Sequence, residues 1–149
     1  MTDSPVLWFD EIGMGDVPQV GGKNASLGEL IQSLKAKGVR VPDGFATTAG
    51  AYRRFLEANG IEAAMRARIK SYRSGETSLR ATGEAIRELF LDSEFPADIS
   101  ESIRSHYREL GGRAGLDRLS VAVRSSATAE DLPDASFAGQ QETFLNIAG

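Results

Sequence analysis

The apolar residues in the middle of this sequence recur with the period of an α-helix, and this pattern constrains the fold more than any other feature. Between residues 48 and 110 they lie three or four positions apart, so they share one face of each helix. The pattern predicts helices over about 48–59, 62–72, 79–90 and 97–110. Gly111 and Gly112 are expected to loosen the chain after the last of them. The side chains predicted to face inward are Tyr52, Phe55, Leu56, Leu79, Thr82, Ile86, Leu89, Phe90, Ile99, Ile103, Tyr107 and Leu110.

Strand-like runs lie near the two ends of the chain, and residues 39–42 and 44–47 are also expected to be extended, since Pro42 disfavours helical geometry at Val41. The run Val6–Phe9 is short and apolar, residues 119–123 are rich in β-branched side chains, and residues 142–147 alternate polar with apolar. We expect the second of these strands to be buried. An earlier helix is predicted to begin at Lys23 and to end at Gly38. This order of elements predicts an α+β (α/β-like) domain in which a helical insert separates the strands.

The composition of the 149 residues excludes several classes of protein. With 17 basic against 21 acidic residues the net charge is −4, so a general affinity for nucleic acids or anionic membranes is not expected. There are no cysteines, which excludes disulfides, thiolate metal sites and cysteine nucleophiles. The first residues carry neither a basic stretch nor an apolar run, so we expect no secretory signal and a cytoplasmic protein.

The first candidate site is the segment from Gly21 to Asn24, which follows an expected irregular stretch over residues 13–20. Two glycines before a helix let backbone N–H groups approach a phosphate, and both the helix start and Lys23 favour an anion. The segment does not match the P-loop, because that pattern needs a glycine where Val17 stands and a hydroxyl residue after the lysine. By itself it is equally compatible with a loop that carries a solvated lysine.

The second candidate is Arg124, which directly follows the predicted strand over residues 119–123. A guanidinium group at a strand end can hold phosphate oxygens in pairs, and three hydroxyl residues stand close behind it. The alternative is a surface ion pair with Glu130 or Asp131, which contributes little stability.

The third candidate is the segment over residues 134–143. Small residues around Gly139 suit a mobile flap over a ligand, and Gln140, Gln141 and Thr143 could orient phosphates or a base. A hairpin turn between two strands is the alternative, and both interpretations can hold together. The only histidine, His106, is predicted to be a partly buried helix residue without a catalytic role.

Together these segments resemble one enzyme family. Residues 20–29, which read VGGKNASLGE, resemble the opening signature of phosphoenolpyruvate synthases. Residues 41–48 resemble the next segment of that family, and residues 122–146 resemble its most distinctive one. The resemblance implies that residues 1–149 form the N-terminal lobe of an ATP-grasp-like nucleotide-binding domain.

The resemblance also implies a site and a reaction. Enzymes of this family transfer a phosphoryl group from ATP to a histidine on a swivelling domain and then to pyruvate, with Mg²⁺ as cofactor. The ATP-binding residues implied in this chain are Lys23, Arg124, Gly139, Gln140 and Thr143. The acceptor histidine, the Mg²⁺ ligands and the pyruvate domain belong to later parts of the family pattern. We therefore expect a shortened fragment, inactive alone and able to self-associate through exposed apolar surface.

Three alternatives stay open. Rifamycin phosphotransferases carry similar Arg-Ser-Ser and Gly-Gln segments but tend to differ after the Gly-Gly-Lys. Pyruvate phosphate dikinases have a methionine-rich flap, unlike residues 137–141. The third alternative is a non-catalytic nucleotide-binding module. An open reading frame with a Thr-Ser-His segment after the codon for Gly149 would favour the enzyme.

Overall fold

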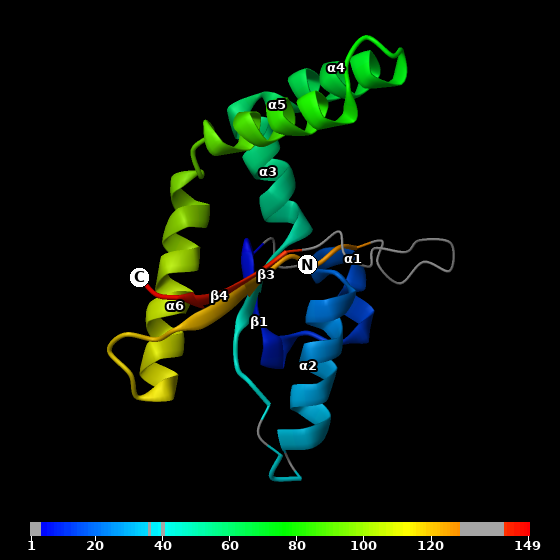
Figure 1. Ribbon diagram of the computed structural model, residues 1–149. Helices are drawn as coiled ribbons and strands as arrows, with labels where there is room; N and C mark the ends of the chain where they lie inside the picture. The colour runs from blue at the N-terminus through cyan, green and yellow to red at the C-terminus, as the bar shows by residue number, and fades with distance from the viewer. Residues whose placement is uncertain (1–3, 36, 40, 129–141) are drawn as a thin grey trace.

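The computed structural model describes residues 4–35, 37–39, 41–128 and 142–149. It combines helices with two small antiparallel sheets, which confirms the predicted α+β class. In Figure 1 the strands lie between helices α2 and α6, whereas α3, α4 and α5 extend away from them as a helical insert. No helix among the described residues is long and apolar enough to cross a membrane.

The N-terminal part is built on a short strand pair. Strand β1 (Val6–Trp8) pairs antiparallel with β2 (Phe45–Thr47). The first lies within the strand predicted over Val6–Phe9, and the second within the segment expected to be extended over residues 44–47. Between them the chain forms two 3-10 turns (Phe9–Glu11 and Met14–Asp16) and helices α1 (Val17–Val20) and α2 (Gly22–Lys35). The expected irregular stretch is therefore partly helical, because a proline is well suited to the first turn of α1. The buried core beneath it consists of Ile12, Val20, Ala25 and Ala46.

Helix α2 packs closely on the first 3-10 turn. A Cβ atom at Gly28 would lie only 2.2 Å from the carbonyl oxygen of Ile12, so the helix can approach the turn only because this residue is glycine. One turn later, Gln32 Nε2 donates a hydrogen bond of 2.8 Å to the same oxygen. These contacts hold α2 against the β1 segment.

The helical insert follows the predicted order. Helices α3 (Ala49–Asn59), α4 (Ile61–Arg73) and α5 (Leu79–Leu91) surround a second small core of Phe55, Leu56 and Ile61. Two residues predicted to face inward do not do so. Tyr52 is 49% exposed and stacks on Phe90, and Leu79 is 68% exposed. Periodicity correctly predicted the helices, but Tyr52 is covered on one side only, by the Phe90 ring of α5, and Leu79 is the first residue of α5 and largely exposed.

Helix α6 (Ala97–Ala114) is longer than predicted, because Gly111 and Gly112 continue it instead of loosening the chain. Gly111 is buried, and a Cβ atom there would meet the Leu116 carbonyl oxygen at 3.0 Å. The residue is thus glycine for a close packing contact, and the helix ends at Gly115 in a left-handed conformation.

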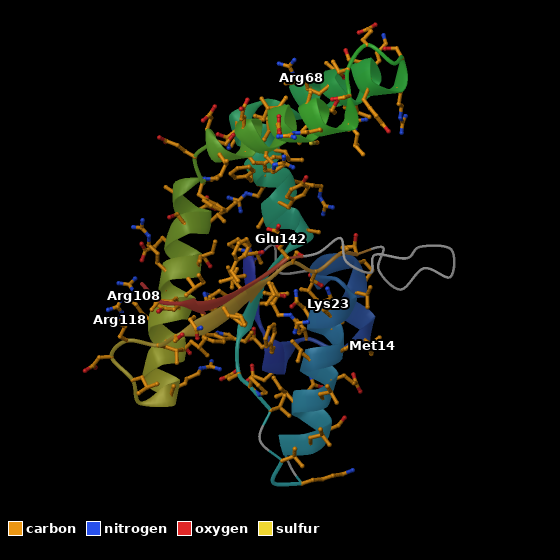
Figure 2. All side chains as sticks on the ribbon, in the orientation of Figure 1. Met14, Lys23, Arg68, Arg108, Arg118 and Glu142 are labelled. Atoms are coloured by element: carbon orange, nitrogen blue, oxygen red, sulfur yellow. The ribbon has the colours of Figure 1, made fainter. Side chains whose placement is uncertain are left out.

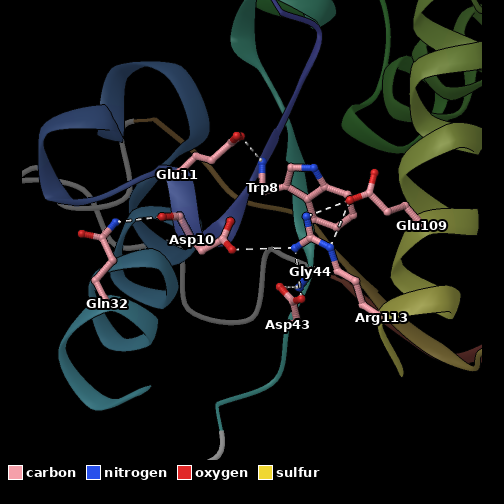
Figure 3. A network of polar contacts seen from close by, with 8 residues as sticks. All are labelled: Trp8, Asp10, Glu11, Gln32, Asp43, Gly44, Glu109 and Arg113. Atoms are coloured by element: carbon pink, nitrogen blue, oxygen red, sulfur yellow. Dashed lines mark hydrogen bonds and ion pairs between the residues drawn. The ribbon is translucent and has the colours of Figure 1, made fainter. Parts of the chain in front are cut away.

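Arg113 connects the end of α6 to the β1 segment (Figure 3). Its guanidinium carbon lies 3.6 Å from the centroid of the Trp8 ring. The same group pairs with Glu109 at 2.9 Å, Asp43 at 3.3 Å and Asp10 at 3.7 Å. Burial lowers the pKa of Arg113, but the hydrogen bonds that it donates to Glu109 and Asp43 raise it, and the net pKa lies above its usual value. The network anchors α6 independently of the last strands.

The last two strands form a hairpin. Strand β3 (Val121–Arg124) pairs antiparallel with β4 (Thr143–Ile147). The strands were predicted correctly, but the expectation that the first is buried is wrong, since Val123 is 48% exposed and no residue of β3 is buried. β-branched residues favour the extended backbone whether or not another layer covers the strand, so this composition does not determine burial.

Candidate functional site

The start of α2 contacts the segment that follows β3. The Gly22 N–H donates a hydrogen bond of 3.3 Å to the Ala127 carbonyl oxygen. At Gly21, where φ is +79°, a Cβ atom would lie 2.3 Å from Ser126 Oγ and 2.9 Å from that carbonyl oxygen. Only glycine permits this backbone conformation and this approach. Two of the candidate segments, distant in the sequence, are therefore adjacent in space.

Lys23 is the second residue of α2 and is half-buried. The first turn of the helix contains no acidic side chain, so nothing in that turn opposes an anion at the N-terminus. Asn24 uses its side-chain amide locally, donating a hydrogen bond of 2.7 Å to the Val20 carbonyl oxygen. Figure 2 shows Lys23 near the top of α2, on the side of the molecule toward which β3 runs from α6. The helix start thus offers positive potential next to the segment after β3.

Arg124 and Thr143 are directly opposite each other in the β3–β4 ladder. Directly opposed residues of an antiparallel pair point to the same face, so these two side chains are neighbours. Both are exposed. Ser125 N–H donates to the Glu142 carbonyl oxygen at 3.5 Å, which closes the ladder at this end. Within the described residues Arg124 makes no ion pair, and the two acids proposed as its alternative partners, Glu130 and Asp131, lie outside them.

The structure therefore groups three of the five predicted site residues. Contacts between the start of α2 and the segment after β3 bring Lys23 and Arg124 into one region, and the strand register adds Thr143. Gly139 and Gln140 lie outside the described residues. The contact between Ser126 and Gly21 was not predicted from the sequence. The Ser126 hydroxyl packs against Gly21, and within the described part of the chain its Oγ is buried without a hydrogen-bond partner.

His106 has the position predicted for it. It is half-buried on α6, and its Nδ1 lies 2.7 Å from the Ser102 carbonyl oxygen, one helical turn earlier. Its ring packs 4.8 Å from the Trp8 ring and 5.5 Å from the Phe45 ring, measured between centroids. A hollow of about 570 Å³ beside it is lined by β1 and the two 3-10 turns and contains none of the predicted site residues. These contacts give His106 a packing role.

The comparison with protein families identifies the chain. Residues 17–149 match the family described as "Pyruvate phosphate dikinase, AMP/ATP-binding domain". The chain belongs to this family. It is 53% identical over 150 residues to a phosphoenolpyruvate synthase of Neisseria meningitidis serogroup B, covering 100% of this chain and 19% of the relative. It is 54% identical to the phosphoenolpyruvate synthase of Pseudomonas aeruginosa and 50% identical to that of Escherichia coli, in each case over 97% of this chain and 18% of the relative.

The relatives confirm the resemblance found in the sequence motifs. Their match extends over the helical insert as well as the three motif segments, because nearly the whole chain aligns. The chain spans only 18–19% of the length of these three relatives. The family match supports a nucleotide-binding role for the domain, and these relatives are phosphoenolpyruvate synthases.

Proposed function

We propose that this chain forms the N-terminal part of the ATP-binding domain of a phosphoenolpyruvate synthase, and that it contributes residues that bind the ATP phosphates. The observation that carries this proposal is the contact of Gly21 and Gly22 with Ser126 and Ala127. It joins a helix start that carries a lysine to a strand end that carries an arginine. The family match to an AMP/ATP-binding domain supports the same ligand. We also propose that the complete domain has an ATP-grasp-like fold.

Each proposed residue has a distinct task. Lys23 places a point charge beside the N-terminus of α2, where the helix dipole also favours phosphate oxygens. Arg124 presents a planar guanidinium group that can hold two oxygens at once, and Thr143 adds a hydroxyl donor on the same face. Gly139 and Gln140 are proposed to belong to a flap that closes over the phosphates and excludes water. Charge stabilisation by such groups is the main contribution of a protein to phosphoryl transfer.

The proposed reaction converts ATP, pyruvate and water into AMP, phosphoenolpyruvate and phosphate. The phosphoryl group travels through a histidine on another domain. Among the described residues no group of three or more His, Asp or Glu side chains could hold a metal ion. As the family resemblance implies, and because the chain spans only 18–19% of the length of these relatives, we assign the Mg²⁺ ligands, the acceptor histidine and the pyruvate site to other parts of the enzyme. By the same proposal the 149-residue chain alone is catalytically silent, and the enzyme acts in the cytoplasm.

The proposal is tested by ATP binding to the full-length enzyme in isothermal titration calorimetry. Losing one charge-assisted phosphate contact costs roughly 1.5–3 kcal/mol, so Lys23→Ala and Arg124→Ala should each weaken ATP binding about 10- to 100-fold. The matched controls are Lys70→Ala and Arg68→Ala, both at exposed residues of α4 in the helical insert. Figure 2 shows Arg68 there, far from Lys23. The controls should bind ATP like the parent. Parent-like binding by both Lys23→Ala and Arg124→Ala would show that the site is misassigned.

A competing acceptor is distinguished by the product. Rifamycin phosphotransferases share the Arg-Ser-Ser and Gly-Gln segments, so ATP binding alone does not exclude that activity. Formation of phosphoenolpyruvate from ATP and pyruvate by the full-length enzyme supports the synthase. Phosphorylation of a rifamycin without phosphoenolpyruvate formation would instead identify the enzyme as a rifamycin phosphotransferase.

A further inference from the structure

The β3–β4 hairpin that presents Arg124 and Thr143 has little support from side-chain packing. Its large apolar side chains are exposed: Val123 is 48%, Phe144 55%, Leu145 66% and Ile147 44% accessible. A two-stranded hairpin without a covering layer is marginal in water. Its orientation therefore depends on the few hydrogen bonds that fasten its ends.

One end is fastened by a single side chain, Tyr107 on α6. The Tyr107 hydroxyl donates a hydrogen bond of 2.5 Å to the Leu119 carbonyl oxygen, just before β3. The Tyr107 hydroxyl oxygen in turn accepts a hydrogen bond of 3.0 Å from the Gly149 N–H, just after β4. One hydroxyl group thus ties both strands to α6.

Helix α6 is a rigid support for this contact. Ile99 and Leu110 of α6 are buried, and Arg113 ties its last turn to Trp8, Asp10 and Asp43. The helix is thereby linked to the β1–β2 part of the domain, on which α2 also packs. An attachment to α6 consequently fixes the hairpin relative to the helix that carries Lys23.

The opposite end of the hairpin is fastened by the contact of Gly22 with Ala127. Between the two attachments the strand register is irregular, since Val121 opposes Ile147 but Val123 opposes Phe144. Strand β4 therefore contains one extra residue, and Asn146 in this bulge has a φ of +58°. A bulge bends and twists a hairpin locally, so the ladder alone does not determine the direction of the end that carries the arginine.

We propose that Tyr107 is a positioning residue for the phosphate-binding site, acting through Arg124 and Thr143. This inference rests on the proposed function. Tyr107 does not touch the ligand. Its hydroxyl holds the end of the hairpin remote from Arg124, and so sets the angle at which the guanidinium group faces the start of α2.

The test is a double-mutant cycle between Tyr107 and Arg124 in the full-length enzyme, read as ATP affinity by calorimetry. Tyr107→Phe keeps the ring and removes the bridging hydroxyl. We expect it to weaken ATP binding about three- to tenfold, the effect of one to two net hydrogen bonds. In the Arg124→Ala background the same substitution should have a clearly smaller effect, because only Thr143 is left for it to position. Tyr72→Phe, on the exposed surface of α4, is the matched control and should bind ATP like the parent.

Hydrogen exchange gives a second, independent measurement. The Gly149 amide and the β3 amides should exchange faster in Tyr107→Phe than in the parent, whereas amides of α4 should not change. Equal weakening of ATP binding in both backgrounds, or parent-like affinity of Tyr107→Phe, would reduce Tyr107 to a structural contact and overturn the inference. Parent-like affinity of Arg124→Ala is a different result, since it would remove the proposed site itself.

Discussion

The contact at Gly21 gives the sharpest test of how this site is assembled. Gly21→Ala adds one methyl group where φ is +79° and ψ is 161°, a region that alanine rarely adopts. The backbone strain costs about 1–3 kcal/mol. The new Cβ would also lie 2.3 Å from Ser126 Oγ and 2.9 Å from the Ala127 carbonyl oxygen. Overpacking of this kind adds typically about 1–3 kcal/mol. The expected loss is therefore about 2–6 kcal/mol, the sum of the two estimates.

Gly75→Ala separates the strain from the clash. Gly75 has a φ of +78°, but nothing lies within 4 Å of the position of its Cβ. It should lose only about 1–2 kcal/mol, the backbone contribution of a left-handed residue. Urea denaturation of both variants and the parent measures the difference in the free energy of unfolding. Because the clash forces the start of α2 away from the segment after β3, ATP affinity should fall in Gly21→Ala and stay unchanged in Gly75→Ala.

A second-site variant tests the same steric argument. Adding Ser126→Gly to Gly21→Ala removes the nearest atom, Ser126 Oγ, and should recover part of the lost stability and affinity. Recovery should be incomplete, because the Ala127 carbonyl oxygen and the backbone strain remain. The reasoning would be refuted if Gly21→Ala were no less stable than Gly75→Ala, or if Ser126→Gly brought no recovery.

Three further predictions concern residues outside the candidate site. Arg113→Met removes a cation stacked on an indole ring together with its ion pairs, and should lower the free energy of unfolding, measured in urea, by about 1–2 kcal/mol. Arg108→Met, whose single ion pair is more exposed, should lower it by at most about 0.5 kcal/mol, and equal losses in the two variants would contradict the prediction. The hydrogen bond from Arg54 lowers the pKa of Asp98 in the folded state, so the pair adds stability above the unfolded pKa of the carboxyl group, and this is lost as the pH falls through the folded pKa. In urea titrations at several pH values, Asp98→Asn should be less stable than the parent at neutral pH and approach it in acid; a gap that does not narrow would count against the pair. His106→Gln should leave phosphorylation of the full-length enzyme intact because its ring is packed against two aromatic rings, and mass spectrometry that found an acid-labile phosphoryl group on His106 would overturn this.

Several local features were predictable from the sequence alone. The helices of the insert follow from apolar periodicity, and their ends follow from single residues. Thr48 Oγ1 accepts a hydrogen bond from the Ala51 N–H at the start of α3, and Gly60 ends that helix in a left-handed conformation. Such signals act within a few residues, so neighbouring sequence suffices to predict them. The family motifs likewise identified the relatives and the candidate residues Lys23, Arg124 and Thr143 before any geometry was known.

Only the tertiary structure decided how these segments meet. It showed that Gly111 and Gly112 extend α6, because a glycine can mark close packing as well as a break. It showed that β3 is exposed, since strand propensity does not report what lies above a strand. It also placed Gly21 against Ser126 and Thr143 opposite Arg124. These are contacts between residues far apart in the chain, and they depend on the packing of α2, α6 and the hairpin together, which no local pattern encodes.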